Sequence, residues 1–213
     1  LPEIVDAEYI NIILDVLFKY NANLTKYSKT QLENLVKSEI ASFSDSHLNK
    51  YDGIFRHSFL SRIVDQTDPS ILNSHIRVFV SKSFTVDALN PQTITLDYGT
   101  ELTMDDGIAV AASSPYVYRN TTLYIGDSKY IPDPNNTTLR TLYSYYYDPR
   151  TQEKVTFLEN IGSIDLSSGK VVIENLNTDD GTTVVHLDLI PVSNDIAPKR
   201  NQLITLNTSR MYV

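Results

Sequence analysis

The alternation of apolar and polar residues over 9–20 predicts a strand with one buried face. Every even position from Ile10 to Phe18 is apolar, whereas the odd positions include Asn11, Asp15 and Lys19. A period of two matches the alternating side-chain directions of a strand. A helix is the alternative interpretation, because some odd positions are apolar as well, and we favour the strand.

Two helical stripes follow this strand. Ser28 stands where a helix N-cap is expected, and Gln31 three residues later completes a capping box. The apolar residues after it share one helical face: Leu32, Leu35, Val36, Ile40 and Phe43. Asp68-Pro69 ends the second stripe, which consists of Phe55, Phe59, Leu60, Ile63 and Val64. Alternation returns at 76–80, which predicts another strand.

After residue 86 the helical pattern ends and short alternating runs take its place. Turn-forming residues such as Asn90-Pro91 and Asp148-Pro149 separate these runs. Short strands with regular punctuation are typical of antiparallel sheets. The expected strands are 93–97, 107–111, 122–125, 139–147, 154–158, 170–173, 184–190 and 203–206.

The order of these elements predicts an α+β fold. Two helices between two strands return the chain to its starting end, so we expect the strands to pair antiparallel with both helices on one face. We therefore predict two domains. Residues 1–86 form a strand-helix-helix-strand two-layer unit, and residues 87–213 form an antiparallel β-rich domain.

Composition narrows the range of partners. The chain has 213 residues, no cysteine and a formal net charge of −8. Without cysteine, disulfide and thiol chemistry are excluded. The acidic balance argues against nucleic acid as a partner, because binding to it depends on Lys and Arg neutralising phosphates. No run reaches the ~20 apolar residues of a membrane helix, so we expect no membrane partner either.

The sequence carries no recognisable catalytic or cofactor motif. It has neither a Gly-x-Ser-x-Gly elbow nor a His-Glu-x-x-His pattern. Asn175, Asn177 and Asp179 have the spacing of EF-hand ligands, but Asp180 replaces the required glycine, so we interpret this segment as a hairpin loop. We expect no enzyme activity, no cofactor and no bound metal. A glycosidase stays open, because its two carboxylates come from distant parts of a chain.

Tyrosine is the one overused aromatic residue, with 14 copies and no tryptophan in the chain. Tyr143, Tyr145 and Tyr147 share one face of an expected strand, with Tyr146 on the opposite face. The favoured interpretation is a half-buried cross-strand ladder. The functional interpretation is an interface formed by all four residues, because tyrosine combines a large contact area with a polar tip. Sugar stacking is a third interpretation.

Three stretches of the chain resemble a known family. The first runs from Glu8-Tyr9-Ile10-Asn11-Ile12 through Phe18-Lys19-Tyr20-Asn21 to residues 31–36, the second covers 61–73 and the third covers 195–204. In these stretches the chain resembles the larger baseplate wedge subunit of T-even-like contractile-tailed bacteriophages, which is related to baseplate J-like proteins. The resemblance covers nearly the whole chain, as an internal or C-terminal part of a longer subunit.

The resemblance implies a structural role in a viral tail. Such subunits associate as homodimers, join into a ring around the tail hub, and hold other baseplate wedge and tail proteins. It implies a late protein of the virion that is assembled in the host cytoplasm. No functional residue is carried over, because the family has no active site to map. From the residues alone, a β-rich carbohydrate- or receptor-binding module is the alternative function.

Overall fold

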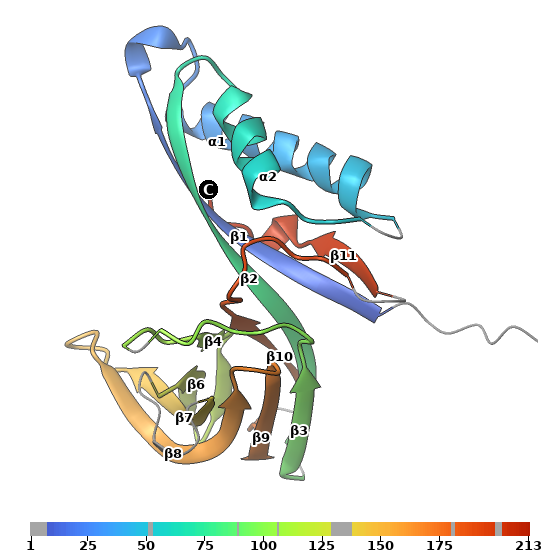
Figure 1. Cartoon of the computed structure of the whole chain (residues 1–213). Coiled ribbons are helices and arrows are strands. Elements are labelled where there is room, and N and C mark those ends of the chain that lie inside the picture. The colour runs from blue at the N-terminus through green and yellow to red at the C-terminus, as the bar shows by residue number, and fades with distance from the viewer. Residues whose placement is uncertain are drawn as a thin grey trace, which may run out of the picture. The chain divides into compact units, whose positions relative to one another are not determined.

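The computed structural model describes residues 8–50, 53–88, 90–105, 107–128, 138–179, 182–198 and 202–213 (Figure 1). Contacts among residues divide the chain into two compact units. Unit 1 comprises Leu1–Val80 and Ser193–Val213, and unit 2 comprises Ser81–Val192. Whether residues 1–86 and 87–213 fold independently as domains stays a prediction.

Strands make up most of the regular structure. The helices are α1 (Lys29–Phe43) and α2 (His57–Gln66), with short helical turns η1 (Ala22–Leu24), η2 (Ser44–Leu48) and η3 (Thr208–Arg210). The strands are β1 (Glu8–Tyr20), β2 (Ile71–Asp87), β3 (Gln92–Asp97), β4 (Ala111–Ser113), β5 (Tyr116–Tyr118), β6 (Thr121–Asp127), β7 (Leu139–Tyr147), β8 (Lys154–Asp165), β9 (Lys170–Leu176), β10 (Thr182–Leu189) and β11 (Gln202–Leu206). They lie in the order β11-β1-β2-β10-β4-β6-β7-β8-β9-β3, and β5 pairs with β6.

The predicted α+β class is wrong, because the chain is predominantly β and its strands form one large mixed sheet. Two features prevent the strand-helix-helix-strand segment from forming a separate two-layer unit. Strand β1 pairs in parallel with β11, which comes from the end of the chain. Strand β2 continues for 17 residues and contributes to both units. The periodicity of a segment indicates which of its side chains share a face. It does not indicate which distant strand forms hydrogen bonds with its backbone.

In unit 1 the local signals fold as expected. The strand over 9–20 is confirmed as β1, and helix α1 begins with the predicted capping box. The Ser28 hydroxyl accepts the Gln31 N–H at 3.3 Å, and the Gln31 side chain accepts the Ser28 N–H at 2.8 Å. Figure 1 shows α1 and α2 on one side of β1 and β2. Their buried stripes consist of Leu32, Val36, Ile40 and Phe43 on α1, and Leu60 and Val64 on α2.

The C-terminal segment completes unit 1. Strand β11 pairs with β1 in parallel from Glu8 opposite Gln202 to Ile12 opposite Leu206. Just before it, Ile196 and Phe55 exchange backbone hydrogen bonds of 2.9 and 3.0 Å. The Asp195 carboxylate accepts the backbone N–H of His57 at 2.8 Å, at the first turn of α2. A carboxylate at a helix N-terminus accepts a hydrogen bond from a backbone N–H that has no partner within the helix. Its negative charge also interacts favourably with the positive end of the helix dipole, so this contact stabilises α2.

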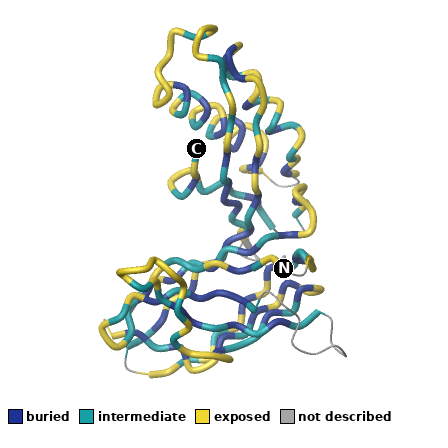
Figure 2. The backbone as a smooth tube through the Cα atoms, turned by 90° about the vertical axis from the view of Figure 1, so that its left-hand side faces the viewer, coloured by how far each residue is buried: buried dark blue, intermediate teal, exposed yellow. Residues whose placement is uncertain are grey.

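In unit 2 the sheet curls around an apolar interior (Figure 1). Strands β4, β6, β7, β8, β9 and β3 pair antiparallel in that order. Figure 2 shows buried residues along these strands and exposed residues at their turns. Burying each large apolar side chain contributes ~1.5–3 kcal/mol. The fully buried interior includes Leu123, Ile125, Leu142, Ile164, Val171, Ile173, Val185 and Leu187.

One glycine allows β8 to fit between its neighbours. Gly162 pairs with Leu142 on one side and with Ile173 on the other. A Cβ atom at this position would lie 2.1 Å from the carbonyl oxygen of Val172. Because backbone cannot move out of the way as a flexible side chain can, glycine is required here.

Candidate functional site

Four tyrosines from two adjacent strands form a cluster on the outer face of the unit 2 sheet. Tyr143, Tyr145 and Tyr147 come from β7, and Tyr124 comes from β6, directly opposite Tyr145. The rings of Tyr124 and Tyr145 stack with centroids 5.5 Å apart. Tyr147 lies edge-on to both, at 5.5 Å from Tyr124 and 5.6 Å from Tyr145. This arrangement is a cross-strand aromatic ladder, and we call these four residues the tyrosine cluster.

The four tyrosines predicted as an interface differ in exposure and direction. Tyr145 is only 5% exposed, whereas Tyr147 is 41% exposed. Tyr143 and Tyr146 are half-buried. Tyr146 has the opposite parity on β7, so its side chain points to the other face of the sheet and does not join the tyrosine cluster. The role of these residues as an interface stays a prediction.

Two further residues, which the sequence did not indicate as neighbours of these tyrosines, support the cluster. Gly126 lies opposite Tyr143, and a Cβ atom there would lie 3.1 Å from the Cε1 atom of Tyr145. The Lys154 ammonium group lies 4.5 Å from the centroid of the Tyr145 ring, a cation–π distance. A glycine inside a strand was the available signal, because such glycines often mark a close approach.

Two phenol groups of the cluster, those of Tyr143 and Tyr145, hold their protons more tightly than a free tyrosine. Burial raises the pKa of Tyr145, and its hydrogen bond to Tyr147 raises it further. Burial also raises the pKa of Tyr143, with a smaller contribution from the Asp127 charge. Neutral phenols both donate and accept hydrogen bonds, so this surface offers polar tips on large apolar rings.

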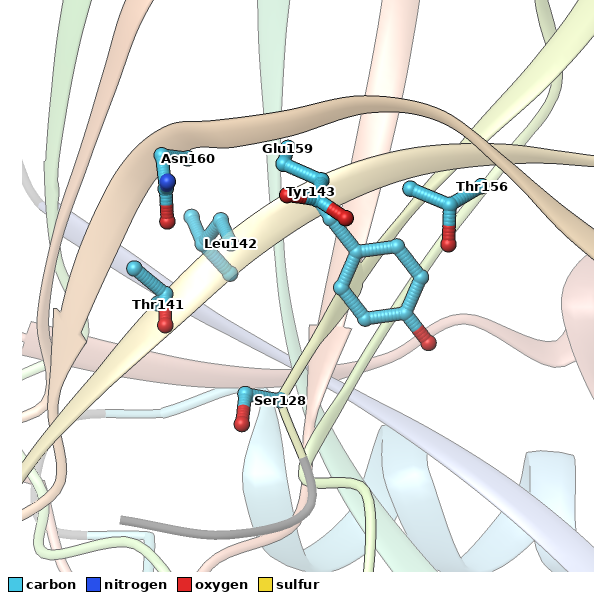
Figure 3. Close-up of a pocket in the computed structure, with 7 residues that line it drawn as sticks. All are labelled: Ser128, Thr141, Leu142, Tyr143, Thr156, Glu159 and Asn160. Carbon is cyan, nitrogen blue, oxygen red and sulfur yellow. The ribbon is translucent and has the colours of Figure 1, made fainter. Parts of the chain in front are cut away.

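A pocket of about 320 Å³ lies beside the cluster, where β7 and β8 lose their regular pairing. Leu142 pairs with Gly162, and Ser144 pairs with Leu158, so β8 carries two extra residues in this interval. These bulged residues include Asn160, which has a left-handed φ of 54°. Seven residues line the pocket (Figure 3): Ser128, Thr141, Leu142, Tyr143, Thr156, Glu159 and Asn160.

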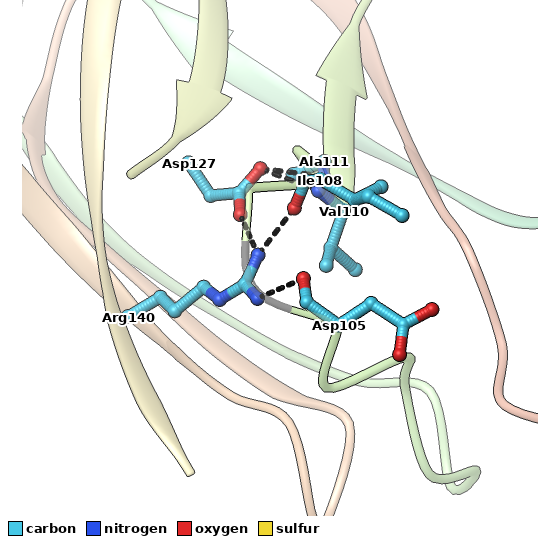
Figure 4. Close-up of polar contacts among 6 residues, drawn as sticks. All are labelled: Asp105, Ile108, Val110, Ala111, Asp127 and Arg140. Atoms are coloured by element: carbon cyan, nitrogen blue, oxygen red, sulfur yellow. Dashed lines mark hydrogen bonds and ion pairs between the residues drawn. The ribbon is translucent and has the colours of Figure 1, made fainter. Parts of the chain in front are cut away.

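A fully buried ion pair joins β6 and β7 on the interior side of the sheet (Figure 4). Arg140 and Asp127 are both 0% exposed, and the guanidinium lies 3.0 Å from the carboxylate. Arg140 also donates to the carbonyl oxygens of Ile108 at 2.6 Å and Asp105 at 2.9 Å. Its Nε–H has no acceptor among the described residues. The pair is structural, because it is sealed from solvent and anchors backbone.

This ion pair explains why the predicted strand over 107–111 is wrong. Only Ala111 of that run lies in a strand, as the first residue of β4. The backbone N–H groups of Val110 and Ala111 both donate to the Asp127 carboxylate at 2.8 Å. A buried carboxylate therefore satisfies donors that a neighbouring strand would otherwise have to satisfy.

A second candidate surface lies on unit 1, and we call it the open face. Tyr9, Leu17 and Tyr212 are exposed there, at 52%, 58% and 70%. Asp15 and Arg77 form an ion pair among them, with Arg77 Nε 2.9 Å from the carboxylate. Asp15 also forms a parallel bridge with Tyr212. Exposed apolar residues around a charge pair are a common composition for a protein interface.

Metal sites, the 175–179 segment and membrane-spanning helices are three further features to consider among the described residues. Within the described ranges, no group of three or more His, Asp and Glu residues could hold a metal ion. The interpretation of 175–179 as a hairpin loop is wrong, because β9 and β10 are not neighbours in the sheet. Instead, the Asp179 carboxylate accepts the Asn120 N–H at 2.5 Å, and Asp180 lies outside the described residues. In the described part, every helix is too short or too polar to cross a membrane.

One segment of the chain matches a known protein family. Residues 8–83 match the family of the baseplate structural protein gp6, C-terminal domain III. A search of curated proteins found no match. The matched residues contain β1, both α-helices and most of β2, and with them much of the open face. The tyrosine cluster and the pocket lie outside the match.

The match supports a structural protein of a phage tail baseplate, located in the virion. Such a location implies contacts with other baseplate components. The resemblance that the sequence suggested is confirmed at this level. Its finer content, the J-like wedge subunit, self-association and ring formation, goes beyond what the match supports.

Proposed function

We propose that this chain is part of the larger baseplate wedge subunit of a contractile-tailed phage and acts as a scaffold, without enzyme activity. The observation that carries the proposal is the match of residues 8–83 to a baseplate domain. The fold is consistent with such a role. The strands of each unit bury apolar side chains, and polar contacts such as Arg140 with Asp127 hold segments that the sheet does not pair. A scaffold of this kind presents fixed surfaces to its neighbours.

The open face is the surface through which two copies associate in this proposal. Leu17, Tyr9 and Tyr212 supply apolar area, and the Asp15–Arg77 pair supplies one charge of each sign. In a two-fold dimer the same patch meets itself, so each Asp15 has an Arg77 available on the other copy. Such homodimers then join into a ring and hold other wedge and tail proteins during assembly in the host cytoplasm.

Light scattering after size-exclusion chromatography tests self-association. The wild-type chain is expected to form dimers, and Leu17→Asp is expected to form monomers, because a buried unpaired carboxylate strongly disfavours an interface. Leu72→Asp is the matched control, since Leu72 is 62% exposed, also lies in a strand of unit 1 and is not part of the open face. A wild-type chain that stays monomeric at high concentration, or two variants that behave alike, would contradict this surface.

Docking of other proteins is tested by mixing the wild-type chain with neighbouring baseplate proteins of the same phage. We expect a larger complex in sedimentation velocity than either protein forms alone. No complex with any baseplate protein would remove the support for a scaffold. The alternative, a carbohydrate- or receptor-binding module, draws on a different part of the chain, the tyrosine cluster and its pocket.

A further inference from the structure

The pocket in unit 2 forms where the regular hydrogen bonding between two strands is interrupted. Between Leu158 and Gly162 the β8 strand leaves the regular ladder with β7. Asn160 adopts φ of 54°, a conformation that costs a non-glycine residue free energy and that persists only where its surroundings hold it. The pocket volume of about 320 Å³ suits one small cyclic ligand.

The lining of the pocket combines one aromatic ring with several short polar side chains. In Figure 3 the ring of Tyr143 extends from β7 toward the same side as the hydroxyl groups of Thr141 and Thr156 and the amide of Asn160. Glu159 adds a carboxylate, a group whose two oxygens can accept hydrogen bonds from two adjacent donors of a ligand. Leu142 is the one aliphatic residue of the lining.

This set of groups fits the chemistry of a sugar ring. A pyranose has one face of C–H groups, which pack on an aromatic ring, and an edge of vicinal hydroxyls, which both donate and accept hydrogen bonds. Tyr143 provides the ring, Glu159 and Asn160 provide acceptors for adjacent hydroxyls, and Thr156 provides a group that donates and accepts. Purely apolar ligands would leave these polar groups unpaired.

The negative charge of the pocket lining favours a neutral sugar over an anionic one. Glu159 is the only charged residue of the seven that line the pocket, and the chain as a whole carries a net charge of −8. An anionic sugar would be repelled from this carboxylate. A neutral sugar has no such penalty, so we propose that the pocket bounded by Tyr143, Thr156, Glu159 and Asn160 binds one neutral pyranose unit of a glycan.

Saturation-transfer NMR of the wild-type chain with D-glucose, D-galactose and N-acetyl-D-glucosamine tests the proposal. We expect transfer to at least one of these sugars, and a titration then gives its affinity. Glu159→Gln is expected to weaken this sugar about tenfold, because hydrogen bonds to a charged acceptor are stronger than those to an amide. Tyr143→Leu is expected to abolish the transfer to the C–H face.

Glu174→Gln is the matched control, because Glu174 is an exposed carboxylate on β9 that does not line the pocket. It is expected to bind the sugar as the wild-type chain does. Transfer to none of the three sugars, or equal affinity of Glu159→Gln and the wild-type chain, overturns the proposal. The test does not depend on the scaffold role, since it uses unit 2 residues and no other baseplate protein.

Discussion

Replacement of Arg140 by methionine is expected to destabilise the chain severely. Arg140 is fully buried and donates to Asp127 and to the carbonyl oxygens of Ile108 and Asp105. Methionine has similar length but no donor. Its introduction leaves a buried carboxylate without its cation and two carbonyl groups without donors. Removing one partner of a buried pair costs about 3–5 kcal/mol. For a chain of this size that loss corresponds to a melting temperature lower by about 6–20 °C.

Urea unfolding of a double-mutant cycle separates the ion pair from the general effect of the substitution. Asp127→Asn keeps the shape of the side chain and removes its charge, so the buried guanidinium loses its counter-charge. We expect the double variant to be about 1–3 kcal/mol more stable than the sum of the single losses predicts, because neither charge then remains unpaired. Lys29→Met is the control, since the Lys29 side chain is 74% exposed and its ion pair with Glu33 is worth below about 1 kcal/mol.

Two results would refute this reasoning. The first is a loss for Arg140→Met that is no larger than the loss for Lys29→Met. The second is strict additivity of the Arg140 and Asp127 substitutions, which would mean that their charges do not interact in the folded chain. Either result would show that the ion pair does not hold Asp105 and residues 108–111 against the sheet.

Three further predictions concern single contacts. Asp195→Ala removes the acceptor of the His57 N–H, so urea unfolding should show a loss of about 1 kcal/mol, with a smaller loss for Asp195→Asn; no loss would show that the cap is irrelevant. Gly126→Val places atoms against the Tyr145 ring and should cost about 1–3 kcal/mol with a changed near-ultraviolet circular dichroism spectrum, whereas an unchanged spectrum would contradict this packing. Burial raises the pKa of Tyr116 to about 12. The unfolded chain releases this proton near pH ~10, so stability should be complete below that pH and fall as pH rises toward ~12. Absorbance titration should find some tyrosines ionising only on unfolding, and uniform ionisation of all tyrosines in the folded chain would contradict it.

The sequence by itself determined those helices and strands whose stabilising contacts lie within a few residues of one another. The capping box at Ser28 and the stripe that follows it predict α1, and the structure confirms both. The strand over 139–147 is confirmed with the same bounds as β7. These elements depend on hydrogen bonds and side-chain directions within a few residues, which periodicity and capping patterns record directly.

Periodicity also predicted which side chains of one strand share a face. It did not predict contacts between strands. The alternation along β7 separates Tyr146 from Tyr143, Tyr145 and Tyr147, and these three residues contact one another through their rings. It did not indicate that Tyr124 lies opposite Tyr145, because register between strands depends on the whole sheet. The sequence therefore predicted three of the four residues of the tyrosine cluster as a pattern and none of its cross-strand contacts.

Only the tertiary structure decided the architecture. The parallel pairing of β1 with β11 joins residues almost 200 positions apart, such as Asn11 and Thr205, whose side chains bond at 2.6 Å with a separation of 194. The burial of Arg140 against Asp127 and the bulge that opens the pocket at Asn160 are likewise long-range outcomes. Each results from competition among all strands for partners and for apolar surface, which no short stretch of sequence contains. For this reason the helices were predictable one by one, whereas the mixed sheet and its candidate sites were not.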